Sequence, residues 1–209
     1  MAFPFEQFQN VRPCLYHLTA RGNLPRIAAT RSLVCAASLL SAVGEAQVIR
    51  QKRRGMHPVA INGTTVCIRD QDPLYRGKMA LEQGWSFEDF IELLNHHVFF
   101  WAGWDHEPVG AGLRHFNRYR HEPPVVLRVR FADLVHANKD VVPLFCQYNS
   151  GSPRCSYGSP SPRGSRTFVP AQDALFSPSK VVEVVFRGSV SLPDGTERAD
   201  VYSGPWQPL

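Results

Sequence analysis

The sequence predicts an α+β domain built on a mixed β-sheet, and three observations support this. Short apolar segments typical of strands, such as Val98–Trp101, are interspersed with segments whose apolar residues recur at helical spacing. The helical segments gather early in the chain and the strand-like segments late, which fits a mixed sheet better than a doubly wound one. No GxGxxG or GxxxxGK[ST] motif is present, so neither a Rossmann nor a P-loop nucleotide site is indicated.

Length and composition are those of an ordinary globular protein. With 209 residues, the chain has room for one well-cored domain, so we expect a single domain over 1–209 with its core at about 14–192. The chain is 44% hydrophobic and 20% charged, which argues against disorder. There is no apolar run of membrane-spanning length, and the N-terminus does not resemble a secretion signal. We therefore expect a cytoplasmic protein without membrane contact.

The cysteines and the net charge bear on the redox state of the protein and on its possible partners. The five cysteines are odd in number and lack CxxC spacing, which predicts reduced thiols and no zinc site built mainly of thiolates. The net charge of +5 favours a polyanionic partner such as nucleic acid. Many cytosolic domains reach this charge without such a partner, so the charge alone leaves both readings open.

The first third of the chain predicts strands and helices in alternation. A short strand over 15–19 precedes a helix over 23–30 and a second apolar helix over 35–43. The basic cluster at 50–54 is interpreted as a solvated helix end or loop. A further strand is expected over 66–69.

Ser86 begins the clearest helix of the sequence. Ser86 and Asp89 have the spacing of a capping box, in which each side chain satisfies a backbone N–H of the other residue. The buried stripe of this helix would be Phe90, Ile91 and Leu94.

The remaining strands are expected late in the chain. The continuous apolar segment 98–101 predicts a buried strand, and 125–131 alternates between apolar and arginine residues. The segment 147–168 is rich in Ser, Gly and Pro and has no acidic residue, so we predict a long functional loop. A core strand over 181–186 follows, then a last strand near Val190 and a loose tail.

Glu183 is the residue that most departs from its surroundings. On a strand it would share a face with Val181 and Val185, and its sequence neighbours are also apolar. Burying an unpaired charge is costly, so Glu183 should be paired, exposed or functional. The simpler alternative is a surface glutamate that faces water.

His17, Thr19 and Asn23 form a polar group near the end of the first predicted strand. A lone histidine at such a position is more often structural or solvated than catalytic. Thr19 and Asn23 could equally cap the following helix.

Two further segments invite a chemical interpretation. The first combines several histidines and acids, but their spacing matches no known helical metal motif, so we expect no metal; its members are His96, His97, Asp105, His106, Glu107 and His115. The second, 114–121, interleaves basic and aromatic residues. It could contact phosphates or stack on bases, or it could be a solvated amphipathic helix.

Taken together, these segments resemble one known family. The segment YHLTARGNLPRIAATRSL, from Tyr16, resembles the signature YHxT…NLxxI…GxL of DarT-like enzymes, which ADP-ribosylate DNA bases, and of related uncharacterised domains. The strand VFFW with the later Arg114 segment is similar to their second block. The strand KVVEVVF resembles the one that carries their catalytic glutamate. Ser32 replaces the glycine of the first block, and the arginine-rich segment of the DNA-modifying members is not closely matched.

The resemblance implies an ADP-ribosyltransferase fold: a split, mixed sheet with an NAD cleft and peripheral helices. NAD would be a substrate and no metal would take part. Cleavage of the nicotinamide–ribose bond develops positive charge on the ribose, which a carboxylate stabilises. The implied residues are Glu183 and Arg114 for catalysis, with Arg69 as second choice for the arginine; Tyr16, His17, Thr19, Asn23, Arg69 and Trp101 for NAD; and Tyr148, Arg154, Arg163 and Arg166 for the acceptor.

The acceptor and the biological role stay open to alternatives. The arginine-bearing loop favours a nucleic-acid acceptor, and the resemblance implies a toxin whose partners are an antitoxin or an ADP-ribosyl hydrolase. The alternatives are transfer to protein, a related NAD-using RNA 2′-phosphotransferase, a non-catalytic module that binds NAD or nucleic acid, and a plain interaction domain.

Overall fold

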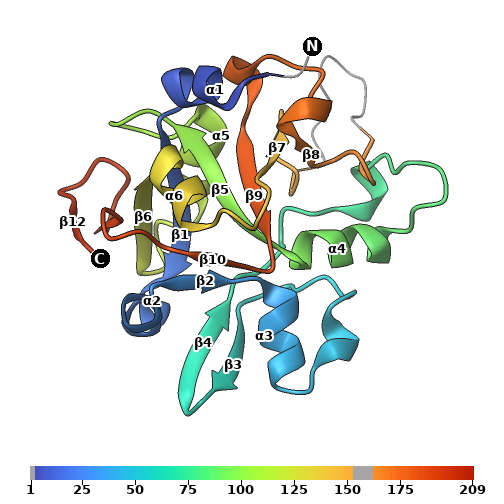
Figure 1. Ribbon diagram of the computed structural model, residues 1–209. Coiled ribbons are helices and arrows are strands. Elements are labelled where there is room, and N and C mark those ends of the chain that lie inside the picture. Colours follow the sequence, from blue (N-terminus) through green and yellow to red (C-terminus); the bar gives the residue numbers. More distant parts are fainter. Residues whose placement is uncertain (1–2, 153–161) are drawn as a thin grey trace.

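The protein has the predicted α+β class and is built on an eight-stranded sheet (Figure 1). The computed structural model describes residues 3–152 and 162–209. From one edge of the sheet to the other, the strands are β12 (Gln207–Pro208), β11 (Glu197–Ala199), β6 (Pro124–Arg130), β1 (Cys14–Ala20), β5 (His97–Gly103), β9 (Glu183–Arg187), β7 (Leu144–Cys146) and β8 (Val169–Pro170).

The expectation of a mixed sheet is wrong for the described residues. Each pair of neighbouring strands of the large sheet within 3–152 and 162–209 is antiparallel. Helices interspersed among strands do not settle strand direction, because a connection through a helix can return the chain to a neighbouring strand in either sense. The pattern of the sequence therefore predicts the elements but not their direction.

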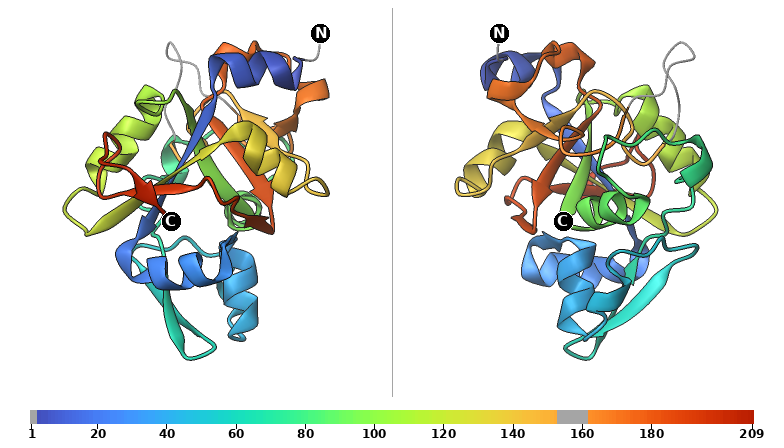
Figure 2. Two further views of the ribbon diagram at one scale, coloured as in Figure 1. Left: turned by 60° about the vertical axis from the view of Figure 1, so that its left-hand side comes forward. Right: turned by 90° about the vertical axis from the view of Figure 1, so that its right-hand side faces the viewer.

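A smaller layer packs below the large sheet in the view of Figure 1. It holds the helices α2 (Leu24–Thr30) and α3 (Ala36–Ala42), the strand pair β2 (Ser32–Val34) and β10 (Ser189–Ser191), and the hairpin of β3 (His57–Ile61) and β4 (Thr64–Ile68). The hairpin projects away from the large sheet in both views of Figure 2. Its turn is Asn62-Gly63 with positive φ at both residues, the geometry that two-residue hairpins favour.

Helices cover both faces of the large sheet. On one face, α1 (Phe5–Val11) and α6 (Phe131–Ala137) contribute Phe8 and Leu134 to the largest core cluster. On the other, α4 (Phe87–Asn95) and α5 (Gly110–Arg118) pack in two smaller clusters. None of the helices that the structure describes has the length and apolar character needed to cross a membrane.

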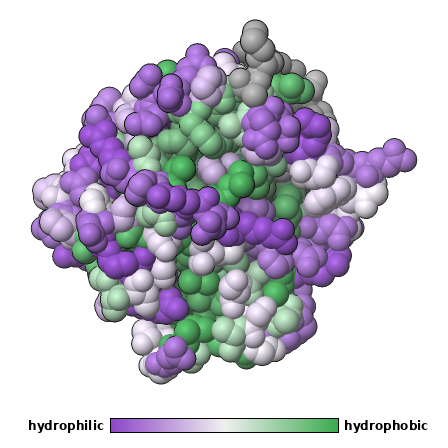
Figure 3. Space-filling model, viewed as in Figure 1, coloured by the Kyte–Doolittle hydropathy of each residue, from purple (hydrophilic) through white to green (hydrophobic). Residues whose placement is uncertain are grey.

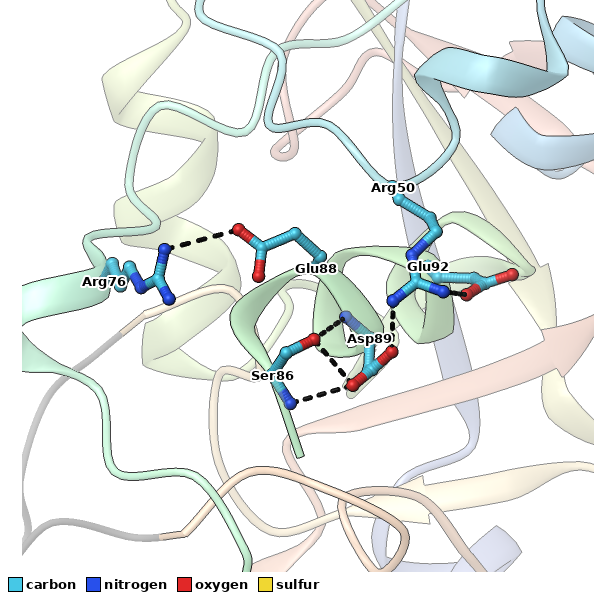
Figure 4. Close-up of polar contacts among 6 residues, drawn as sticks. All are labelled: Arg50, Arg76, Ser86, Glu88, Asp89 and Glu92. Atoms are coloured by element: carbon cyan, nitrogen blue, oxygen red, sulfur yellow. Dashed lines mark hydrogen bonds and ion pairs between the residues drawn. The ribbon is translucent and has the colours of Figure 1, made fainter. Parts of the chain in front are cut away.

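The prediction for α4 is confirmed in detail (Figure 4). The Ser86 hydroxyl accepts the Asp89 N–H at 3.0 Å, and the Asp89 carboxylate accepts the Ser86 N–H at 2.8 Å. Phe90, Ile91 and Leu94 are buried. The first N–H groups of a helix have no intrahelical acceptor, and this cap supplies acceptors for them. The cap therefore stabilises the start of α4.

The other predicted elements agree to within a few residues, with some omissions. The strand expected over 125–131 ends at Arg130, and α6 begins at the next residue, Phe131. The C-terminal segment contains β11 and β12 instead of being a loose tail, and β11 pairs with β6. Hydrophobic residues show at the surface of the lower layer, over β4 and α3, in Figure 3.

Candidate functional site

A cavity of about 290 Å³ lies between the large sheet and the lower layer. Its wall combines β1, β5 and β9 from the sheet with α2, α3 and β4 from the lower layer. The last two residues of α4, Leu94 and Asn95, and His115 of α5 also line it. Of the residues predicted from sequence, it brings together His17, Thr19, Asn23, Arg69, Trp101 and Glu183.

The cavity lies where the large sheet splits. Strand β1 pairs with β6 from Cys14 to Ala20, but it pairs with β5 only from Cys14 to Tyr16. Beyond that point β1 and β5 separate, and each keeps its pairing to the strand on its outer side. The resemblance implies a split sheet; in the structure β1 and β5 remain neighbours in one eight-stranded sheet and separate only beyond Tyr16.

His17 is the first residue of β1 beyond the split. Its Nδ1 lies 2.8 Å from the carbonyl oxygen of Phe99 on β5, so the ring bridges the two separating strands. Burial lowers the pKa of His17 to about 4, so the imidazole is neutral near pH 7. A neutral ring that donates from Nδ1 has its acceptor at Nε2.

Glu183 begins β9 in the middle of the sheet. Its neighbours across the strands are Trp101 on β5 and Cys146 on β7. It is only 3% exposed, so the alternative of a surface glutamate facing water is wrong. Burial raises the pKa of its carboxyl to about 7, because water no longer solvates the charge. At neutral pH the carboxyl can therefore take up or release a proton.

Hydrogen bonds from Ser150 oppose the effect of burial on Glu183. Hydrogen bonds from the Ser150 side chain and from its N–H, which donates to the carboxylate Oε2 at 3.2 Å, both lower the Glu183 pKa. The charge of Arg163 acts in the same direction. Both residues belong to the segment that the sequence predicts as a functional loop.

Arg69 supplies a cation to the same cavity. Its Nη1 donates to Glu122 at 2.7 Å, and its guanidinium lies 4.2 Å from the ring centre of Tyr119. Its Nε and Nη2 are buried and have no hydrogen-bond partner among the residues that the structure describes. These two groups lie on one edge of the guanidinium plane, the arrangement that binds an anionic oxygen pair bidentately.

An aromatic wall adjoins Arg69 and Glu183. The ring centre of His115 on α5 lies 5.3 Å from that of Trp101 and 5.0 Å from that of Tyr119. Burial lowers the pKa of His115 to about 3, so the imidazole is uncharged. Such a wall offers flat, apolar faces on which a heteroaromatic ring can stack.

Asn23 and Thr19 have a structural role as well as a place on the wall. The Asn23 side chain accepts the Cys67 N–H at 2.8 Å and donates to the Cys67 carbonyl at 2.9 Å. It also donates to the Thr19 hydroxyl at 3.1 Å. Asn23 thus ties β4 to the end of β1, two residues before Arg69, instead of capping α2 with its side chain.

Several predicted residues do not line the cavity, among them Tyr16, Arg114 and Arg166. Tyr16 is fully buried on the opposite side of β1 from His17, because side chains alternate along a strand, and its hydroxyl bonds to the Trp104 carbonyl. Arg114 is exposed on α5, and Arg166 is exposed within the segment 147–168. Neither arginine lines the cavity. Arg69, the second choice, lines it because it directly follows β4.

The predicted acceptor residues are placed differently from the expectation. Arg163 is 2% exposed, with its guanidinium 3.9 Å from the ring centre of Tyr148, so both are engaged within the protein. Arg154 lies outside the described residues. An arginine is buried at this position because it donates to a group of backbone carbonyls, which a pattern of charges does not reveal.

Sequence reasoning missed a second arginine of the wall. Arg53, from the cluster interpreted as solvated, donates from Nε to the Arg69 carbonyl at 2.9 Å and from Nη1 to Asn95 at 2.8 Å. Burial lowers its pKa to about 10. His115 and Tyr119 were also missed as cavity residues, although their interleaving with arginines was noted. Among the described residues, no three His, Cys, Asp or Glu side chains gather as a metal group.

Comparison with known proteins assigns the chain to a family. Residues 13–194 match DUF7002, a family of unknown function, and the chain belongs to this family. No curated protein matches the sequence. The split sheet, the buried carboxylate and the unpaired arginine edge are therefore the basis for a functional conclusion.

Proposed function

We propose that the protein is an ADP-ribosyltransferase that cleaves NAD, releases nicotinamide and transfers ADP-ribose to an acceptor. One observation carries the proposal: a single cavity is lined by a buried carboxylate, Glu183, and by Arg69, whose buried Nε and Nη2 have no hydrogen-bond partner among the residues that the structure describes. A carboxylate suits a reaction that develops positive charge, and a guanidinium edge suits a diphosphate. NAD presents both requirements in one molecule.

The residues of the wall fit parts of NAD. Buried donors without partners are costly, so Arg69 favours a ligand that supplies anionic oxygens. Trp101, His115 and Tyr119 offer apolar faces for a base or for nicotinamide. The volume of about 290 Å³ is near the lower end of ligand pockets, roughly 300–1,000 Å³, so part of a dinucleotide would extend outside.

Glu183 would act in its ionised form. The negative charge stabilises the ribose cation that develops as the glycosidic bond to nicotinamide breaks, and it can then accept the proton of the acceptor. His17, with its acceptor at Nε2, would bind a ribose hydroxyl. The position of Glu183 in the middle of the sheet keeps water away from this charge, which strengthens its effect.

The acceptor that we propose is a nucleic-acid base. The net charge of +5 and the exposed arginines Arg114 and Arg120 favour a polyanion. We propose that the protein acts in the cytoplasm as a toxin, opposed by an antitoxin or an ADP-ribosyl hydrolase. Growth on induced expression, compared with that of Glu183→Gln, tests this role.

The decisive experiment measures nicotinamide release and transfer together. Wild type and Glu183→Gln are incubated with NAD and, separately, DNA, RNA or a protein mixture, and the products are analysed by mass spectrometry. With wild type we expect a nucleic acid to gain the mass of an ADP-ribosyl group, and with Glu183→Gln we expect loss of most turnover. Exposed Glu6→Gln is the matched control.

The alternatives give different results in this assay. Label on protein alone would replace the nucleic-acid acceptor by a protein. Binding of NAD without nicotinamide release would indicate a non-catalytic module. Undiminished turnover by a folded Glu183→Gln protein would refute the assigned role of Glu183.

A further inference from the structure

We propose that Arg163 is a positioning residue, which orients the backbone at Ser150 so that the Ser150 N–H donates to Glu183. The positional claim stands on contacts alone, and its relevance to turnover rests on the proposed function. Arg163 is predicted from sequence to bind an acceptor, but it is 2% exposed and contacts the loop from within. Its role is thus to shape the site rather than to bind a partner.

The backbone of Arg163 is held by a neighbouring segment. Its N–H donates to the Ala80 carbonyl at 2.9 Å, and its carbonyl accepts the Glu82 N–H at 2.9 Å. The Glu82 side chain also accepts the N–H and hydroxyl of Ser165, at 2.9 and 2.8 Å. These bonds fix the backbone from which the Arg163 side chain extends.

The guanidinium of Arg163 gathers carbonyls of the segment that carries Ser150. It donates to the carbonyl oxygens of Asn149 at 3.4 Å, Ser150 at 3.3 Å and Ser152 at 2.8 Å. The ring of Tyr148 packs against the guanidinium, 3.9 Å from its centre. One side chain therefore restrains three peptide groups of this segment, two of which are adjacent.

Peptide geometry links this restraint to Glu183. The carbonyl of Asn149 and the N–H of Ser150 belong to the same peptide group, and in a trans peptide they point in opposite directions. When the Asn149 carbonyl faces Arg163, the Ser150 N–H faces away from it. On that side lies the Glu183 Oε2, at 3.2 Å.

The burial of Ser150 and Glu183 means that loss of their hydrogen bond should change the pKa of Glu183. Ser150 is 1% exposed and Glu183 is 3% exposed, so bulk water is poorly placed to replace a lost donor. A carboxylate that loses a hydrogen bond in a buried place becomes harder to ionise. Movement of Ser150 should therefore make Glu183 titrate at higher pH.

The test is a carbon-13 NMR titration of the Glu183 carboxyl in protein with labelled glutamate, assigned by the loss of its signal in Glu183→Gln. Arg163→Lys retains a positive charge but not the planar fork that reaches several carbonyls. We expect it to raise the Glu183 pKa by about one unit, the effect of one weakened bond to a charged group. Arg166→Lys, at an exposed position of the same loop, should leave the titration unchanged.

A second, milder variant keeps the proposal testable if Arg163→Lys does not fold. Tyr148→Leu removes the ring that packs on Arg163 and should raise the Glu183 pKa by a smaller amount. If both folded variants, or Tyr148→Leu alone where Arg163→Lys does not fold, titrate like wild type, the proposal is overturned. The titration needs no NAD, so a shifted pKa in a protein that never cleaves NAD would sustain the positioning role and reject the proposed function.

Discussion

Replacing Glu183 by glutamine should stabilise the protein at alkaline pH, although it should remove most activity. Burial raises the pKa of the carboxyl from its ordinary 4.5 to about 7 in the folded protein. Each unit of pKa difference is worth about 1.36 kcal/mol. Once both folded and unfolded states are ionised, the carboxylate therefore destabilises the folded state by about 3 kcal/mol, and glutamine avoids this cost while still accepting the Ser150 N–H.

The direction of the pH dependence follows from the raised pKa. Below pH 4.5 the carboxyl is protonated in both states and costs nothing. Between 4.5 and about 7 the folded state holds the proton more tightly than the unfolded state, so wild type loses stability as pH rises. The loss is complete above pH 7, where Glu183→Gln should be the more stable protein.

Urea and thermal unfolding at pH 4.5 and pH 8 measure this difference. At pH 8 we expect the variant to melt higher by roughly 6–12 °C, because 1 kcal/mol shifts the melting temperature of a chain of this size by about 2–4 °C. At pH 4.5 the two proteins should differ little. Glu6→Gln, at an exposed position, should follow wild type at both values. Parallel stability of wild type and Glu183→Gln across this range would refute the reasoning from burial.

Four further predictions follow from the site and its supports. NAD cleavage should increase as pH rises through about 7, the pKa that burial gives Glu183, and a pH–rate profile without that limb would contradict a catalytic carboxylate there. Arg69→Gln should weaken NAD binding at least tenfold in calorimetric titration, since it removes the unpaired charged edge; unchanged affinity would place the diphosphate elsewhere. Asn23→Ala should lower the free energy of unfolding by about 2–3 kcal/mol, because it removes three hydrogen bonds, including both to Cys67; a smaller loss in urea unfolding would mean that β4 is held without them. Ser86→Ala should cost about 1 kcal/mol through the lost cap, and a stability equal to wild type would contradict the capping role.

Local pattern was sufficient to predict the elements that depend on local chemistry. The cap of α4 follows from two side chains three residues apart, and its buried stripe from helical spacing. The strand that carries Glu183 follows from its continuous apolar character. The hairpin of β3 and β4 was predicted only in its second strand, although Asn62-Gly63 is a strong local signal for such a turn.

Which polar residues share a cavity could be predicted only in part, because that depends on contacts between distant segments. Arg69 and Arg114 are equivalent as residue types, but only Arg69 follows a strand that Asn23 ties to the split. Arg163 contradicts the usual exposure of arginine, since backbone carbonyls at the other end of the same loop segment accept its hydrogen bonds. A charge pattern contains no information about these partners.

The divergence of β1 and β5 also affects how this site can change in evolution. Beyond Tyr16, each strand has one edge engaged in the sheet, while residues of both, His17 and Phe99 among them, border the hollow. Peptide groups are common to every amino acid, so a ligand that contacts the main chain here would tolerate replacement of the side chains around it. Substitution of the surrounding side chains could then change ligand specificity while the gap between β1 and β5 is retained.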